Sequence, residues 1–313
     1  MNNKAILIFL LIAAAGFTGY QFGQQEKSGP DNAVNPLAIS ADEPDSSVDS
    51  FLSTDLAAVA SIVVLNNSGQ VERARLDGNL DKLVAVTDVL FEQADSGMPA
   101  AQYEVARLLE SCSALMDDSF VHQLKYLEQQ GRPAWYVDRL NSDANACQHI
   151  PFHSLQISEP AYWLAEAKNA GDPAALAEYL GMVANVQDLS GADALAAKVL
   201  LAKNGDAYYR LMPYLVTRDK QMGVYDEEFD AARSGALLRL ACHFGFRSCE
   251  TGSRMVHELC VNSVPMCTPD MGMLEYMQRF EWTSGEAELN QVLFQQYLEA
   301  IERGDASPIF ADN

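Results

Sequence analysis

The chain has 313 residues, of which 49% are apolar and 20% are charged, so it can bury a core and is not a disordered polymer. It carries 43 Asp and Glu residues against 21 Lys and Arg residues, a formal net charge of −22. Binding to nucleic acid or to an anionic membrane surface requires Lys and Arg to neutralise phosphates. We therefore expect no nucleic-acid partner, and membrane contact only through the N-terminal segment.

An apolar run follows Lys4. Residues 5–17 are apolar or small, and residues 18–23 are only weakly polar. The core of this run has the length of a signal-peptide apolar region, whereas residues 5–23 together could just span a bilayer. We expect residues 1–23 to be an uncleaved signal-anchor that holds the protein at the inner membrane, facing the periplasm. The alternative is a cleaved signal peptide and a soluble periplasmic protein.

Residues 24–53 differ in composition from the rest of the chain. They contain Pro30, Pro36 and Pro44, several Ser and Asn residues, and an excess of carboxylates. Such a segment cannot bury enough apolar surface to fold, and it predicts a disordered acidic linker before a helical domain at 54–313. At the start of that domain we expect a helix from Asp55 to Leu65, because Thr54 or Asp55 can cap it. A short hairpin is the alternative, since "SIVVL" is β-branched and "NNSG" favours a turn.

Six cysteines in an exported chain favour disulfides. We expect Cys249 and Cys260 to share one helix, which would place them roughly 16 Å apart and exclude that pair. Bridges across consecutive helices are the first choice, and the exact connectivity stays open. The favoured pairs are Cys112–Cys147, Cys242–Cys249 and Cys260–Cys267.

The domain contains a repeated pattern in which a polar or small run meets a glycine and an Ala-rich segment follows. "EQADSGMPAAQYEVARLL" and "AEAKNAGDPAALAEYL" are the clearest copies. Glycine accepts a positive φ at the end of one helix, and proline suits the first turn of the next. The period predicts stacked αα-hairpins. Their hinges are expected near Gly97, Gly131, Gly171, Gly205, Gly245 and Gly285.

The segment from Trp163 to Gly181 resembles the Sel-one-like repeat, a relative of the tetratricopeptide repeat. The matching positions are Trp163, Ala167, Ala170, Gly171, Ala175, Leu180 and Gly181, and a second copy shares Ala94, Gly97, Ala101, Gln102 and Tyr103. The resemblance covers roughly residues 80–305 and implies an all-α, right-handed superhelix of αα-hairpins with a protein–protein adaptor role. Some exported members carry cysteines that bridge the two helices of a repeat, which is similar to the placement of Cys242 and Cys249.

Known nucleophile, phosphate-binding and zinc-protease motifs are missing from the sequence. Cys147, His149 and His153 lack the second ligand pair of a metal site. The acidic run from Asp226 to Asp230 is typical of a helix start rather than a calcium loop, and His257 is expected on a helix surface. We therefore predict no catalytic residues, no cofactor and no metal.

Paired aromatic residues are the best candidates for a binding surface, because aromatic side chains dominate interaction hot spots. Successive side chains on a helix point about 100° apart, so one of each pair is expected to pack in the core. The sequence thus predicts a non-enzymatic envelope scaffold for another envelope protein or peptide. Alternatives are a periplasmic enzyme, for example a cell-wall hydrolase, with a site in the superhelical groove, and a passive spacer or assembly factor. The candidate aromatic residues are Trp135, Tyr136, Tyr162, Trp163, Tyr208 and Tyr209.

Overall fold

The computed structural model describes residues 64–65, 71–72, 87–117, 119–182, 189–263, 268 and 270–310. All of them belong to one compact unit, Val59–Asn313. The expected signal segment at 1–23 and the acidic linker at 24–53 lie outside the described residues.

The described part of the chain is all-α apart from one two-residue strand pair, which confirms the all-α part of the predicted fold class. Strands β1 (Val64–Leu65) and β2 (Val71–Glu72) pair antiparallel, with Val64 opposite Glu72 and Leu65 opposite Val71. The expected helix is therefore wrong at residues 64–65, where β-branched residues before "NNSG" favour the hairpin alternative. Residues 55–63 of that prediction lie outside the described residues.

The α-helices are mostly ten to nineteen residues long. Three short elements, η4 (Phe152–Ser154), η5 (Arg247–Cys249) and the wide-turn η6 (Met277–Glu281), lie between them. In chain order the α-helices are α3 (Thr87–Asp95), α4 (Pro99–Leu115), α5 (Phe120–Gln129), α6 (Ala134–His149), α7 (Pro160–Asn169), α8 (Pro173–Met182), α9 (Leu189–Leu201), α10 (Gly205–Met222), α11 (Glu227–His243), α12 (Arg254–Ser263), α13 (Met273–Tyr276), α14 (Ser284–Glu302) and α15 (Ser307–Phe310).

Four of the glycines expected at hinges adopt the left-handed conformation that ends a helix. The φ angles are 88° at Gly97, 68° at Gly131, 88° at Gly171 and 83° at Gly245. Proline then begins the next helix in α4 and in α8.

The expected hinges at Gly205 and Gly285 are corrected by the structure. Gly205 is the first residue of α10, where Lys203 takes the left-handed turn with φ 54° and the Asn204 side chain caps the helix. Gly285 lies in the first turn of α14, which starts with a capping box between Thr283 and Glu286. Before α10 the positive φ belongs to Lys203, and at both places a side chain caps the start of the helix, so neither glycine needs a positive φ.

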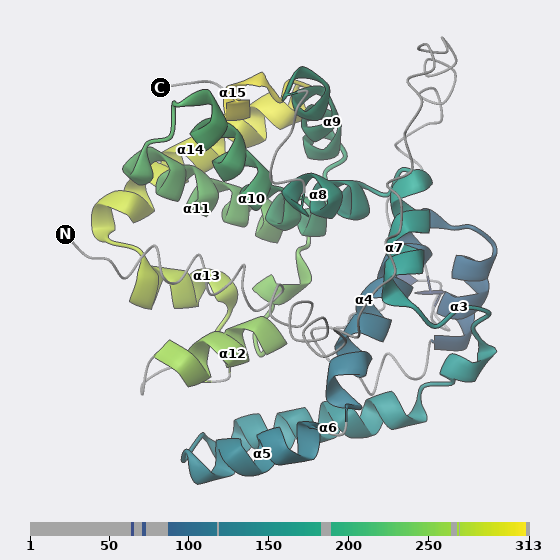
Figure 1. Cartoon of the computed structure of the whole chain (residues 1–313). Coiled ribbons are helices and arrows are strands. Elements are labelled where there is room, and N and C mark those ends of the chain that lie inside the picture. The colour runs from purple at the N-terminus through teal and green to yellow at the C-terminus, as the bar shows by residue number, and fades with distance from the viewer. Residues whose placement is uncertain are drawn as a thin grey trace, which may run out of the picture. The chain divides into compact units, whose positions relative to one another are not determined.

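A continuous helix series is formed by α3, α4, α7, α8, α10, α11 and α14, each packing on the next. Three segments leave this series between packed partners. One carries α9, which packs on α8 and α10, and the other two are called excursions here. The first excursion, residues 116–159, carries α5 and α6, and the second excursion, residues 244–283, carries η5, α12, α13 and η6. In Figure 1, α5 and α6 lie side by side as a hairpin, and α6 also packs on α4. The chain is thus an interrupted series of hairpins rather than one that advances with every helix.

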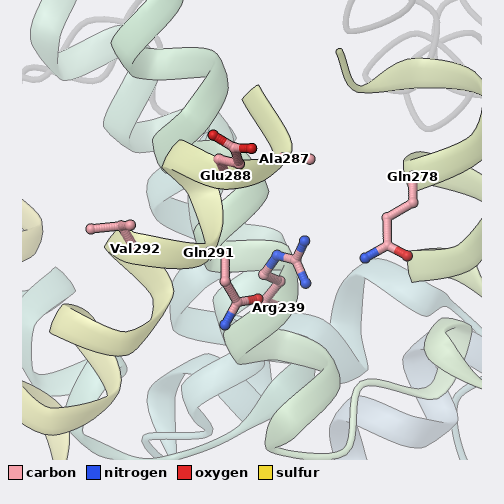
Figure 2. A pocket seen from close by; sticks show the side chains of 6 residues that line it. All are labelled: Arg239, Gln278, Ala287, Glu288, Gln291 and Val292. Atoms are coloured by element: carbon pink, nitrogen blue, oxygen red, sulfur yellow. The ribbon is translucent and has the colours of Figure 1, made fainter. Parts of the chain in front are cut away.

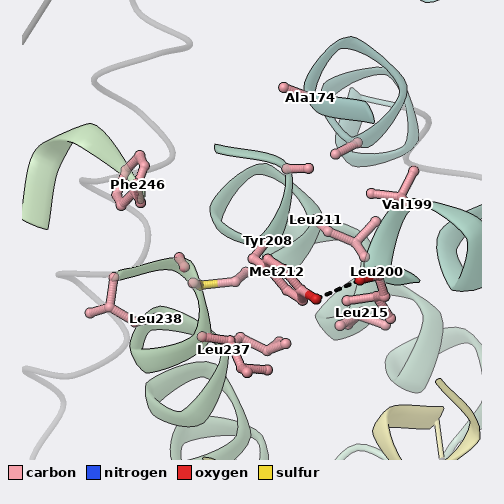
Figure 3. Close-up of a cluster of buried hydrophobic side chains, with 14 of the residues drawn as sticks. Ala174, Val199, Leu200, Tyr208, Leu211, Met212, Leu215, Leu237, Leu238 and Phe246 are labelled. Carbon is pink, nitrogen blue, oxygen red and sulfur yellow. Dashed lines mark hydrogen bonds between the residues drawn. The ribbon is translucent and has the colours of Figure 1, made fainter. Parts of the chain in front are cut away.

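Two hydrophobic cores lie along the helix series. The first gathers side chains of α3, α4 and α6, including Leu90, Leu108 and Leu140. The second gathers side chains from α8 to α15 together with Tyr103 of α4 and Ala167 of α7. Figure 3 shows Tyr208 in this core donating a hydrogen bond to the Leu200 carbonyl. Because Ala occupies many contact positions in the second core, its helices can approach closely.

Each described disulfide ties an excursion to the helix that precedes it. Cys112 at the end of α4 bonds to Cys147 of α6, and Cys242 at the end of α11 bonds to Cys249 of η5. The Cα atoms are 5.4 Å apart in both pairs. Both predicted pairings are confirmed, and they indicate an oxidising, extracellular compartment.

The expected helix shared by Cys249 and Cys260 is wrong. The chain turns at Gly252, with φ 74°, and Ser253 caps α12 by accepting from the Val256 amide. Cys249 therefore belongs to η5 and Cys260 to α12. The third expected pair needs Cys267, which lies outside the described residues.

A buried ionic cluster fastens α9, α10 and α11 together. Arg218 bonds to Asp193 at 2.8 Å and to Asp219 at 2.7 Å, and Arg233 pairs with both Asp219 and Asp230. The Arg233 side chain is only 2% exposed. Removing one partner would leave a buried charge without compensation, so the cluster fixes how these helices meet.

Gly205 should be intolerant of a side chain. A Cβ atom there would lie 2.2 Å from the Phe246 amide nitrogen and 2.5 Å from the Ala241 carbonyl oxygen, both of which are backbone atoms. We expect Gly205→Ala to lower the free energy of unfolding in urea by about 2 kcal/mol or more. The matched control is Gly285→Ala, where nothing lies within 4 Å and the effect should stay within about 0.5 kcal/mol. Equal effects of the two variants would contradict this close approach.

Candidate functional site

The six candidate aromatic residues divide between core and surface. Trp163 is 4% exposed and Tyr208 is 0% exposed, so these two rings serve the cores. Tyr162 is exposed beside Trp163, with its ring edge-on to the indole. One member of each of these two pairs is thus structural, and the six rings do not form a single stacked groove.

Trp135 and Tyr136 connect the two excursions. Their rings meet edge to face in α6, and Trp135 also contacts the His257 ring of α12, with centroids 4.9 Å apart. His257 is buried, so its expected position on a helix surface is wrong. This contact is between segments far apart in the sequence, and hairpin spacing alone could not predict it.

Charged side chains of three hairpins meet on a surface that we call the arginine–carboxylate face. Its members are Glu104 and Arg107 of α4, Glu178 of α8, and Asp206 and Arg210 of α10. Arg107 donates to Glu178 at 3.2 Å, and the Arg210 Nε atom lies 3.8 Å from the same carboxylate. Glu178 of α8 is buried and forms ion pairs with Arg107 of α4 and Arg210 of α10. This one carboxylate therefore connects the three helices.

The second excursion crosses this face at η5. Arg247 pairs with Glu104 of α4, and its Nε atom is 3.5 Å from an Asp206 carboxylate oxygen of α10. The neighbouring Phe246 stacks on Tyr209 of α10, with ring centroids 4.5 Å apart and planes tilted by 17°. The face thus holds a non-α-helical piece of polypeptide through one arginine and one aromatic ring.

Burial changes the proton affinity of two groups beside the face. Burial raises the pKa of the Tyr103 hydroxyl above its usual range. Burial also raises the pKa of Asp172 to about 7, although its carboxylate accepts from the amide of Ala175 at 2.8 Å at the start of α8. Asp172 therefore titrates near neutral pH while it caps a helix.

A second candidate site is an open depression between α11, η6 and α14, with a cavity volume of about 540 Å³. It contains one guanidinium, one carboxylate and two carboxamides, and Figure 2 shows Arg239 and Gln278 pointing toward the same open space. The residues that line it are Arg239, Gln278, Ala287, Glu288, Gln291 and Val292.

Arg239 is held by two groups that leave part of its guanidinium open. Its Nε atom donates to the Asn290 side-chain oxygen at 2.7 Å, and its Cζ atom lies 4.9 Å from the centroid of the Trp282 ring. Burial lowers the pKa of Arg239. Within the described part of the chain, Arg239 has no ion-pair partner, in contrast to Arg107, Arg218, Arg233 and Arg247.

Metal-ligating residues do not gather in the described segments, where no three His, Cys, Asp or Glu side chains are placed to hold an ion. Cys147 is in a disulfide, and His149 bonds to the Asn145 carbonyl through Nδ1 at 2.7 Å. The run from Asp226 to Asp230 begins α11, where Asp226 accepts from the Phe229 amide.

Across the described residues, no helix combines the length and the hydropathy needed to cross a bilayer. The expected anchor at 5–23 lies outside them.

Comparison with known proteins adds no relative: no family model, curated protein or solved structure matches the chain. The two candidate sites therefore depend on their geometry alone.

Sequence reasoning missed both candidate sites. Glu104 and Arg247 are 143 positions apart, and no motif links them. The one available signal is Arg247 directly after Phe246 and inside the short Cys242–Cys249 loop, because a closed loop holds its side chains in a fixed position. For Arg239 the informative property is that no carboxylate among the described residues pairs with it, which only the structure reveals.

Asp172 should give stability a distinctive pH dependence. Its pKa is raised from 3.8 to about 7, so the folded protein binds this proton more tightly than the unfolded chain does. This group's contribution to stability is therefore present at low pH and falls as the pH rises from about 4 to 7. In Asp172→Asn the amide oxygen still caps α8 and no charge is buried. We expect the unfolding free energy of the variant minus that of wild type to increase by a few kcal/mol, on the order of 1.4 per pKa unit, between pH 4.5 and 7.5.

The measurement is urea denaturation of both proteins across that pH range. Asp305→Asn serves as the control because that carboxylate is fully exposed. A pH-independent difference for Asp172→Asn would contradict the proposed titration.

Proposed function

We propose that the protein is a non-enzymatic scaffold of the bacterial envelope that holds a basic segment of another polypeptide. In this proposal its hairpins form a right-handed superhelix of the Sel-one-like type. Residues 5–23 anchor it to the inner membrane, and the linker at 24–53 holds the helical domain away from the bilayer.

The contact between η5 and the arginine–carboxylate face carries this proposal. Helices α4 and α10 supply carboxylates to Arg247, and α10 supplies Tyr209 to Phe246. This is the chemistry by which helical scaffolds bind a peptide: carboxylates hold the basic group and an aromatic ring holds the apolar one. The internal segment serves as an example of the kind of partner that the rest of the face suits.

Charge supports a basic partner. The formal charge of −22 produces a field that speeds encounter with cationic polypeptides and repels acidic ones. Beside Arg107, the Glu110 side chain is 48% exposed at the edge of the face, where it can receive an additional basic group.

The state of the buried carboxylates favours binding over hydrolysis. Glu104 and Glu178 are each paired with arginine, and Asp172 caps α8. A general acid and a nucleophile need freedom to reach a substrate, whereas these groups connect helices.

The proposal is tested by site-specific photo-crosslinking in the native envelope. A photoreactive amino acid replaces Glu110 or Arg210 on the face, and Glu302 at the exposed end of α14 serves as the control position. We expect the same partner from positions 110 and 210 and not from position 302. The yield should fall as salt rises, because a basic segment is attracted electrostatically.

Two outcomes would contradict the scaffold. One is the same set of adducts from all three positions. The other is adducts at positions 110 and 210 whose yield does not change between low and high salt, which would exclude a basic segment as the partner.

A further inference from the structure

The depression between α11, η6 and α14 contains a cation whose charge the described residues do not neutralise. Arg239 uses its Nε atom on Asn290, while its Nη1 and Nη2 atoms have no hydrogen-bond partner in the described part of the chain. The guanidinium lies over the Trp282 ring, which limits how it can turn. The Nη1 and Nη2 donors of Arg239 are thus held in a fixed orientation at the wall of an open depression.

The carboxamides around Arg239 are also available. Gln278 of η6 and Gln291 of α14 line the same depression, and neither side chain has a hydrogen bond within the described residues. Their N–H groups can donate to a group that also accepts from the guanidinium. Figure 2 shows the Gln278 carboxamide facing the guanidinium across the open space.

An arginine such as Arg239, which has no counter-ion among the described residues, is unexpected in so acidic a chain. With 43 acidic residues for 21 basic ones, a carboxylate partner could be supplied for every arginine. A partly buried cation that lacks one gains energy when an anion arrives, because its lost hydration is replaced by charge-assisted hydrogen bonds.

From this arrangement we propose that the depression binds a carboxylate group, with Arg239 as its bidentate counter-ion and Gln278 and Gln291 as additional donors. The site is separate from the arginine–carboxylate face, and it stands or falls independently of the scaffold proposal. The shared chemistry is a planar monoanion, which either the C-terminus of a polypeptide or a small carboxylic acid can supply.

Two features favour a carboxylate over a phosphate. Glu288 lines the same depression, and the whole chain is strongly negative, so a dianion is repelled more than a monoanion. Ala287 and Val292 add apolar surface beside the donors, and Val292 is 53% exposed. That apolar surface can pack against the carbon atoms next to a carboxylate, whereas inorganic phosphate has no apolar group to pack there.

Nuclear magnetic resonance of the exported protein tests the site through the Trp282 indole N–H and the Arg239 Nε–H signals. The probes are acetate, N-acetyl-alanyl-alanine with a free carboxylate, the same dipeptide with a C-terminal amide, and inorganic phosphate. We expect saturable shifts with acetate and with the free dipeptide, none with the amide, and weaker binding of phosphate. A dipeptide that binds more tightly than acetate identifies a polypeptide C-terminus as the source, and equal binding identifies a small acid.

Variants separate this site from general charge effects. Arg239→Gln should weaken binding of the free dipeptide by about tenfold or more, as expected for losing a charge-assisted pair of hydrogen bonds. The matched control is Arg279→Gln in η6, because Arg279 is exposed and already pairs with Glu275 at 2.8 Å, and it should leave binding unchanged. Gln278→Ala removes an exposed side chain without disturbing Asn290, and it should weaken binding by about threefold.

Three results would overturn the proposal. They are equal shifts with the free dipeptide and its amide, tighter binding of phosphate than of the carboxylates, and equal losses in Arg239→Gln and Arg279→Gln.

Discussion

The ion pair between Glu104 and Arg247 is the interaction on which the arrangement of the chain depends. The two residues are 143 positions apart, and their side chains are only 7% and 11% exposed. The pair joins α4, which contributes side chains to both cores, to η5, which packs with the second core. A buried pair of this kind contributes little net stability, yet breaking it from one side costs about 3–5 kcal/mol. The pair therefore acts chiefly to fix the position of η5 against α4.

Two disulfides and one glycine help to position Glu104 and Arg247 for this ion pair. The disulfide from Cys242 to Cys249 closes the loop that carries Arg247, which limits the positions the loop can explore. Gly205 has no side chain, so the backbone around Phe246 can approach α10. On the partner helix, the disulfide from Cys112 ties α4 to the first excursion. Both excursions are thus fixed covalently near their origin and contact each other through Trp135 and His257.

Local rules predicted the parts of the fold that neighbouring residues determine. Glycine at a helix end requires a left-handed turn, so Gly97 and Gly171 could be placed from the sequence, and short spacing made Cys242 and Cys249 partners. The excursions could not be predicted, because the hairpin period is the same whether a hairpin joins the helix series or leaves it. Neither candidate site could be predicted from the sequence. Arg247 meets Glu104 only in the folded chain, and only the structure shows that no carboxylate among the described residues pairs with Arg239.

A double-mutant cycle on Glu104 and Arg247 tests most directly whether this pair connects η5 to α4. The free energy of unfolding is measured in urea for wild type, Glu104→Gln, Arg247→Gln and the double variant. If the pair is the buried connection described here, each single change costs about 3 kcal/mol, and the double change costs about 2 kcal/mol less than the sum of the two. Additive losses within about 0.5 kcal/mol would mean that the residues act independently, and would contradict the account.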